Sequence, residues 1–179
     1  MTETALSATG PGLPTADPRA RQLIGQMTSP FMLRLFMLKS LPLAFIAGLR
    51  VNELDGSHCV VSVPYGWRTQ NPFRSTYFAA QSMAAEMSTG AIGMLAVKLA
   101  PMPVSMLIVG LDATFGKKAT SRAYFTCEGG EQVFAAVRHT CDTGEPVTVT
   151  LPSVGRMKDG SEVSRFSFTW SFKRKSSRD

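Results

Sequence analysis

The strongest constraint on the fold is a long apolar segment, residues 75–97, in which Glu86 is the only charged side chain. Alanine, glycine and methionine dominate this segment, which favours a helix that neighbouring backbones approach closely. A helix that is apolar nearly all round must be buried. We therefore predict one long helix over residues 75–97 at the centre of the protein.

Glycine-containing dipeptides between apolar runs predict tight β-hairpins. The first is Asp55-Gly56, which lies between residues 49–54 and 58–63. The second is Gly129-Gly130, with alternating apolar residues on both sides. We therefore expect one hairpin before the central helix and another after it.

Three further strands are expected after the helix. Residues 104–111 are apolar in both alternating positions, which predicts a central strand covered on both faces. Residues 147–151 alternate, and Asp159-Gly160 turns the chain into the last strand. The last strand has the clearest alternation, with aromatic residues on one face: Phe166, Phe168, Trp170 and Phe172. An antiparallel sheet wrapped around one helix is the simplest packing, which makes the fold class α+β.

The region before the first hairpin predicts helices. Asp17-Pro18 and Ser29-Pro30 each combine a capping side chain with a proline suited to the first helical position. Residues 31–41 are apolar except for Arg34, Lys39 and Ser40, which favours a helix pressed on the core or on a partner. A further interpretation is that residues 31–41, with the basic C-terminus, lie on a membrane surface.

Length and composition favour one compact domain, because 44% of the 179 residues are hydrophobic and 18% are charged. We assign residues 1–16 to a flexible leader, 17–173 to the domain with its N-terminal helical segment, and 174–179 to a basic tail. The last seven residues hold +3 of the net charge of +6, so a solvated terminus is favoured and no nucleic-acid partner is expected.

No secretory signal or membrane-spanning helix is expected, and we predict a cytoplasmic protein. The three cysteines lack a C-x-x-C spacing and are predicted to be small buried groups. His139, Cys141 and Asp142 lack a second set of ligands, so no metal site is predicted. Motifs of serine hydrolases, phosphate-binding loops and dinucleotide enzymes are absent from the sequence.

Glu86 is the leading candidate for chemistry. An unpaired buried carboxylate is costly, so Glu86 must have a raised pKa, have a partner, or reach a water-filled cleft. A carboxyl group tuned in this way suits general-base catalysis. A structural glutamate hydrogen-bonded to a neighbouring element is the alternative.

The stretch from Asn71 through Tyr77, Phe78 and Ala79 to Glu86 resembles the signature of hotdog-fold acyl-CoA thioesterases of the phenylacetate-degradation type. In that family an Asn precedes a His-Gly-Gly triplet at the start of the central helix, and a catalytic Asp or Glu follows on the helix. This chain has Tyr77-Phe78-Ala79 in place of the triplet. The sequence is most similar to the divergent thioesterase-like branch known as a domain of unknown function.

The resemblance implies a hotdog fold, a homodimer or higher homo-oligomer, and an acyl-CoA or other acyl thioester as substrate, with no cofactor. It implies that Glu86 acts as base or nucleophile and that Asn71 orients the water or the carbonyl. The backbone at Tyr77, Phe78 and Ala79 would hold the thioester carbonyl.

Two questions remain open from the sequence. Lys117 and Lys118 could contact coenzyme A phosphates, and a solvated turn is the alternative. Phe78 in place of glycine favours a non-catalytic acyl-CoA or lipid-binding module, whereas the spacing of Asn71 and Glu86 favours a thioesterase.

Overall fold

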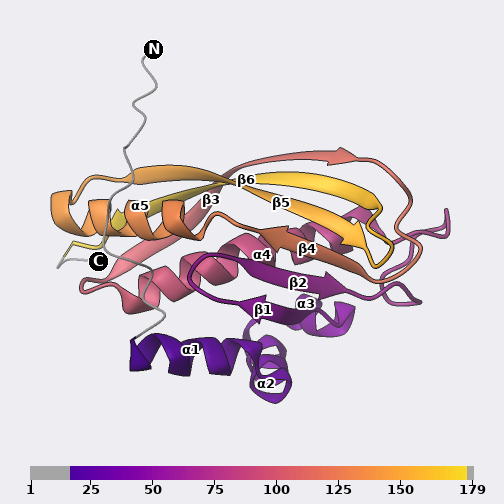
Figure 1. Cartoon of the computed structure of the whole chain (residues 1–179), viewed down its shortest axis with the longest axis horizontal. Coiled ribbons are helices and arrows are strands. Elements are labelled where there is room, and N and C mark those ends of the chain that lie inside the picture. Colours follow the sequence, from indigo (N-terminus) through magenta and orange to yellow (C-terminus); the bar gives the residue numbers. More distant parts are fainter. Residues whose placement is uncertain (1–16, 177–179) are drawn as a thin grey trace, which may run out of the picture.

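One antiparallel sheet of six strands wraps around a single long helix in the computed structural model, which describes residues 17–176 (Figure 1). The strand order is β1-β2-β4-β5-β6-β3. The helix, α4 (Phe78–Leu99), packs on all six strands of the sheet and begins directly after a loop that follows β2. The predicted α+β architecture is confirmed. The strands are β1 (Arg50–Leu54), β2 (Cys59–Val63), β3 (Val104–Phe115), β4 (Ala123–Cys127), β5 (Val147–Met157) and β6 (Glu162–Arg174).

Helix α4 is the predicted central helix, with its start moved from residue 75 to Phe78. The preceding residues stay outside the helix because their N–H groups bond to loop carbonyls: Thr76 donates to Ala119 and Tyr77 donates to Thr69, each at 2.7 Å. Twelve of its residues are buried, as its apolar composition requires.

Three buried polar contacts fix α4 to the sheet. The Gln81 side chain accepts from Ser164 Oγ at 2.7 Å. Further along the helix, Ser88 Oγ and Ser153 Oγ lie 2.8 Å apart, and Trp170 Nε1 donates to Thr89 Oγ1 at 2.9 Å. Because buried polar groups must be paired, these contacts fix the orientation of α4 about its own axis more precisely than apolar packing alone would.

The N-terminal region forms three helices, α1 (Pro18–Thr28), α2 (Pro30–Ser40) and α3 (Pro42–Ala47). Both predicted caps are present: Asp17 Oδ1 accepts from Arg19 N at 2.8 Å, and Ser29 Oγ accepts from Met32 N at 3.5 Å. Helix α1 packs against β1 and α4, while α2 packs on α1, α3 and β1.

The first predicted hairpin is confirmed, because β1 pairs with β2 across Asp55 and Gly56. The second prediction is wrong. Gly130 begins helix α5 (Gly130–Thr143) instead of turning the chain into a strand. The buried residues of α5 recur at helical spacing, and this pattern outweighs the short run of alternation: Val133, Ala136, Val137, Thr140 and Cys141.

The prediction of a central strand over residues 104–111 is also wrong. Strand β3 lies at the edge of the sheet and pairs only with β6. Leu107, Val109 and Leu111 are exposed, so this strand is apolar without being covered by its own chain. Four strands rather than five follow α4, since α5 replaces one of them.

The aromatic face of β6 is buried as predicted, and its rings contribute to one core with β2, β4 and α4. The three cysteines are buried and free, which confirms their prediction as small buried groups. Within residues 17–176 there is no helix that is long and apolar enough to cross a membrane. The predicted leader, residues 1–16, and the last three residues of the basic tail lie outside the described part of the chain.

Candidate active site at the start of helix α4

Asn71 organises the loop that leads into α4. Its Oδ1 accepts from the N–H groups of Phe73 and Ser75 at 3.0 and 3.2 Å and from Ser75 Oγ at 3.2 Å. These bonds hold a tight turn in which Arg74 has a φ of 57°. No partner for the Asn71 amide nitrogen is found among residues 17–176. The oxygen of Asn71 is therefore used by the fold, and its N–H donors remain for a ligand.

The start of α4 offers backbone donors. The first N–H groups of a helix have no intrahelical acceptor, and the cap residue Tyr77 makes no side-chain bond to them. Phe78, the first helical residue, is 55% exposed, and its ring contacts Tyr77 and Phe115 at centroid distances of 4.8 and 6.4 Å. The donors thus lie beside an open aromatic surface.

A depression of about 180 Å³ lies at this end of the helix. It brings together four of the predicted site residues, which are Asn71, Phe78, Lys117 and Lys118. The two other predicted carbonyl-site residues, Tyr77 and Ala79, flank Phe78 and do not line the depression.

Lys117 and Lys118 are exposed at the rim of this depression. Lys117 Nζ donates to Ser161 Oγ at 3.3 Å, and Lys118 Nζ donates to the carbonyl of Phe73 at 3.4 Å. Neither lysine forms an ion pair within residues 17–176. Both ammonium groups are therefore available to an anionic group at the mouth of the depression.

Glu86 lies further along α4, half-buried, and does not line the depression. Burial raises the pKa of its carboxyl group. No hydrogen bond or ion pair of this carboxylate is found within residues 17–176. Gly90 gives it room, since a Cβ at Gly90 would lie 3.0 Å from Glu86 Oε1 and 3.3 Å from the Trp170 ring.

A half-buried stripe of α4 connects Glu86 to the start of the helix. Ala79, Ser82 and Met83 precede Glu86 on this stripe and are each half-buried rather than fully covered. The seven steps from Ala79 to Glu86 give a rise of about 10 Å along the axis. Helical side chains lean toward the N-terminus, which brings the carboxyl group closer to the first-turn donors.

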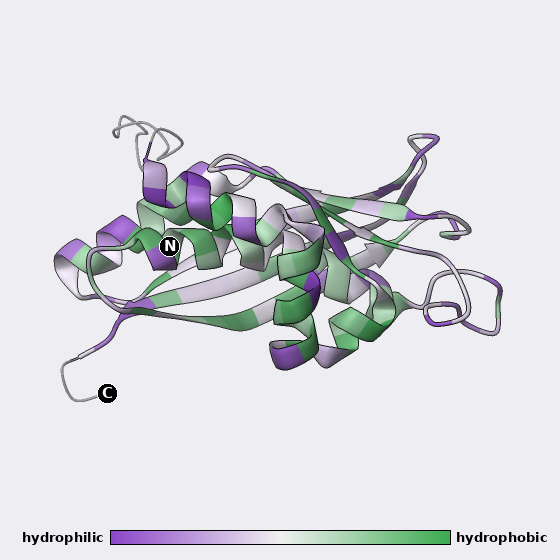
Figure 2. Cartoon of the chain, turned by 90° about the horizontal axis from the view of Figure 1, so that it is seen from below, coloured by the Kyte–Doolittle hydropathy of each residue, from purple (hydrophilic) through white to green (hydrophobic). Residues whose placement is uncertain are grey.

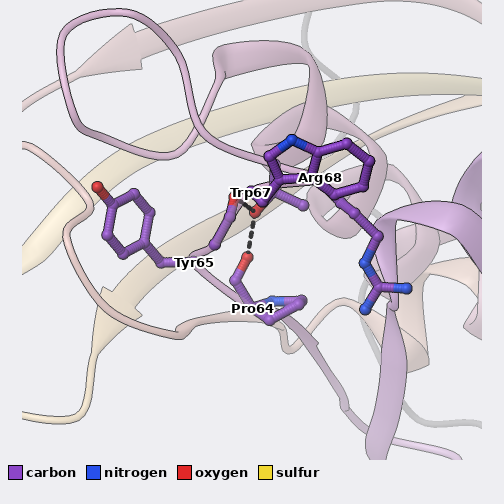
Figure 3. Close-up of a pocket in the computed structure, with 6 residues that line it drawn as sticks. Pro64, Tyr65, Trp67 and Arg68 are labelled. Carbon is purple, nitrogen blue, oxygen red and sulfur yellow. Dashed lines mark hydrogen bonds between the residues drawn. The ribbon is translucent and has the colours of Figure 1, made fainter.

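A second depression, of about 190 Å³, lies in the loop after β2 (Figure 3). Pro64, Tyr65, Trp67 and Arg68 line it, and Thr69 Oγ1 closes the loop by donating to the Pro64 carbonyl at 2.6 Å. It does not include any predicted site residue. Sequence reasoning missed this loop and also missed Gln81, whose Nε2 donates to the Thr76 carbonyl at 2.9 Å and so fixes the helix start.

Among the described residues, no group of three or more His, Cys, Asp or Glu side chains is arranged to hold a metal ion. His58 pairs with Glu53 and Asp55 in the first hairpin, at 3.2 and 3.0 Å.

The family model described as "Domain of unknown function (DUF4442)" matches residues 31–172. The chain belongs to this family. The matched range includes every predicted site residue, strands β1 to β5 and all but the last two residues of β6. No curated protein matches the sequence at a significant level.

Solved structures with the same fold include thioesterases. A Pseudomonas aeruginosa protein described as a "Probable Thioesterase" is 15% identical with a TM-score of 0.68, covering 84% of this chain and 100% of its own. A Haemophilus influenzae thioesterase is 11% identical with a TM-score of 0.60, covering 85% and 95%. A Staphylococcus aureus thioesterase is 13% identical with a TM-score of 0.55, covering 74% and 98%. At these identities the likeness establishes the fold, so the chain has the hotdog fold that these proteins share.

Proposed function

We propose that the chain hydrolyses an acyl thioester, with acyl-CoA as the substrate class and Glu86 as the general base. The observation that carries this proposal is the carboxyl group of Glu86, which has no partner within the described residues. It lies on the accessible stripe of α4 and has a raised pKa. Among the described residues no buried side-chain oxygen lacks a hydrogen bond, so the unpartnered carboxyl group of Glu86 reaches solvent, where a water molecule can meet it.

The geometry supports different roles for the start of α4 and for Glu86. The first-turn N–H groups would polarise the thioester carbonyl and hold the developing oxyanion, an interaction worth about 3 kcal/mol per donor in other enzymes. Glu86 would accept a proton from water as the water oxygen attacks the carbonyl carbon. The carbon–sulfur bond then breaks, and the thiolate takes the proton from Glu86.

Asn71, Lys117 and Lys118 are assigned to binding. The free N–H donors of Asn71 would orient the attacking water or the carbonyl group. The lysines at the rim would contact the phosphates of coenzyme A, while the exposed rings of Phe78 and Phe115 would contact the acyl chain. A second copy of the chain would cover the open side of this surface.

One comparison supports a joint functional role for Asn71 and Glu86. For the Staphylococcus aureus thioesterase, one structure has a glutamine replaced by alanine and another has a glutamate replaced by alanine. These two positions are 15 residues apart, and so are Asn71 and Glu86.

Substitution Glu86→Gln tests the catalytic role, because it keeps the shape and removes the base. We expect a loss of about 10²–10⁴ in kcat for acyl-CoA hydrolysis, with little change in acyl-CoA binding. The wild-type rate should rise with pH through the raised pKa of Glu86. Full activity in Glu86→Gln would reject this role, and Glu145→Gln, at an exposed position, is the matched control.

Phe78 favours a second candidate, a non-catalytic acyl-CoA-binding module. Its exposed ring occupies the helix start where the resembled thioesterases have glycine, and it narrows the approach of a thioester carbonyl to the backbone. Binding of acyl-CoA by the wild type, without hydrolysis over a range of chain lengths, would establish this second function.

A further inference from the structure

An unusually apolar surface lies on the side of the molecule remote from β3. It is formed by α2, α3 and the loop that carries Trp67, and we call it the α2–α3 surface. Figure 2 looks at the molecule from the side where α1 and α2 lie; hydrophilic and hydrophobic positions are mixed along α1, whereas hydrophobic positions predominate in α2. The exposed side chains that define the surface are Phe31, Leu35, Leu38, Leu43, Ile46 and Trp67.

Helix α2 presents these residues as an ordered outer face. Leu33 and Met37 are buried and face the core. Phe31, Leu35 and Leu38, at i, i+4 and i+7, share the opposite face and are 75%, 55% and 56% exposed. With 3.6 residues per turn, Arg34 and Lys39 fall on either side of this outer stripe. The outer surface of α2 is therefore an apolar stripe with one cation on each side.

The Trp67 loop continues the surface next to α3. A Cβ at Gly48, which caps α3, would lie 3.3 Å from Arg68 and 3.5 Å from Pro64, so the loop contacts the end of α3. The neighbouring Trp67 side chain is 85% exposed (Figure 3). An exposed tryptophan beside arginine is the combination favoured at the headgroup level of membranes.

The charge on the surface has a single sign. Residues 18–52 contain five basic and no acidic residues, and residues 64–85 contain no acidic residue. Within residues 17–176, no ion pair involves Arg34, Lys39 or Arg68; the Arg34 guanidinium lies over the Phe45 ring at 6.0 Å. These cations are therefore available to lipid phosphates.

We propose that the α2–α3 surface binds anionic lipid bilayers, with α2 lying flat in the headgroup region. Helix α2 has 11 residues and is about 16 Å long, which suits lying in the interface and is too short to span. A second copy fits less well, because a two-fold contact would place Arg34 and Lys39 close to their own copies without any acidic residue to pair with. The proposal does not depend on the proposed thioesterase activity.

Flotation of the full chain with vesicles tests the proposal. We expect binding to an equal mixture of phosphatidylcholine and phosphatidylglycerol, weak binding to phosphatidylcholine alone, and loss of binding at high salt. Arg34→Gln with Lys39→Gln should weaken binding at least about tenfold. Arg138→Gln with Lys158→Gln, which removes the same charge from exposed positions elsewhere, should have little effect.

The apolar contribution is tested by Leu35→Ser with Leu38→Ser, which should abolish flotation, whereas Met102→Ser, at an exposed position in the loop between α4 and β3, should retain it. Vesicles should shift the fluorescence of Trp67 to shorter wavelength, and Trp67→Phe should remove this shift because Trp170 is already buried. Absence of flotation with anionic vesicles would overturn the proposal. So would a smaller oligomer caused by Leu35→Ser with Leu38→Ser, because that surface would then be a protein interface.

Discussion

The Glu86 carboxyl group is costly to ionise in the position where α4 holds it. Burial raises its pKa, and no cation or hydrogen-bond donor within residues 17–176 offsets that effect. In the unfolded chain the group ionises near its ordinary pKa of 4.5. Between that value and the higher pKa of the folded state, the folded protein binds more protons than the unfolded chain. The free energy of unfolding therefore falls as the pH rises through this window.

Glu86→Gln should consequently stabilise the protein above this window. Folding lowers the acid dissociation constant of Glu86. For every tenfold decrease in this constant, we expect Glu86→Gln to raise the Tm by about 3 °C. Thermal unfolding at pH 8 and at pH 4 measures it, and the difference between variant and wild type should vanish at the lower pH. A lower Tm for Glu86→Gln at pH 8 would show that the carboxylate has a stabilising partner. Exposed Glu145→Gln should have little effect at either pH.

Sequence reasoning reached Glu86 and missed the detail of Asn71, for a physical reason. A lone charge in an apolar helix has few environments open to it, and the sequence left three: a raised pKa, a partner or a water-filled cleft. In the structure, burial raises the pKa of Glu86. The bonds of Asn71 Oδ1 to Phe73 and Ser75 depend on the turn that the loop adopts, with Arg74 at positive φ. Spacing along the chain does not encode that turn.

The elements themselves were predictable where a single pattern acted. The caps at Asp17 and Ser29, the Asp55-Gly56 hairpin and the aromatic face of β6 follow from local rules. Helix α5 was missed because Val133 and Val137 satisfy a strand alternation and a helical repeat equally well. Strand β3 was predicted at the centre of the sheet and lies at its edge. An apolar run looks the same in the sequence whether the strand is covered on both faces or lies at an uncovered edge.

Gly130, at the start of α5, allows a contact that no other residue would allow. A Cβ there would lie 2.1 Å from the Gly56 carbonyl oxygen and 2.7 Å from Ser57, both backbone contacts of the first hairpin. The Gly130 N–H also donates to the Ser57 carbonyl at 3.0 Å. The first hairpin and α5 therefore meet through their backbones.

Gly130→Ala should lower the free energy of unfolding by about 1–3 kcal/mol, because backbone atoms must move apart. Chemical denaturation measures the change. Gly25→Ala in α1 is the matched control, since no atom lies within 4 Å of the added Cβ. That substitution should be neutral or stabilising by up to about 1 kcal/mol. Equal stability of Gly130→Ala and the wild type would contradict this close backbone contact.

The whole molecule has an uncovered side at the edge of its sheet. Strand β3 is 12 residues long and pairs on one side only. Leu111 and Phe115 pair with Phe168 and Ser164 of β6, so their side chains point to the same face as α4, yet they are 51% and 53% exposed. A long apolar edge of this kind is avoided in isolated monomers, because it pairs readily with another chain. The same surface continues into Phe78 at the start of α4.

We predict a homodimer in which a second copy covers this edge and completes the walls of the proposed acyl site. Sedimentation equilibrium at micromolar concentration should give twice the 19.4 kDa mass of the chain. Leu111→Lys should convert the dimer to a monomer, because a two-fold contact brings the new charge close to its own copy in an apolar surface. Leu35→Lys, at a similarly exposed leucine of α2, should leave the mass unchanged.

Since the proposed acyl site would lose one wall, Leu111→Lys should also weaken acyl-CoA binding, whereas Leu35→Lys should preserve it. A monomeric wild type, or dissociation by Leu35→Lys instead of Leu111→Lys, would place the interface elsewhere or remove it.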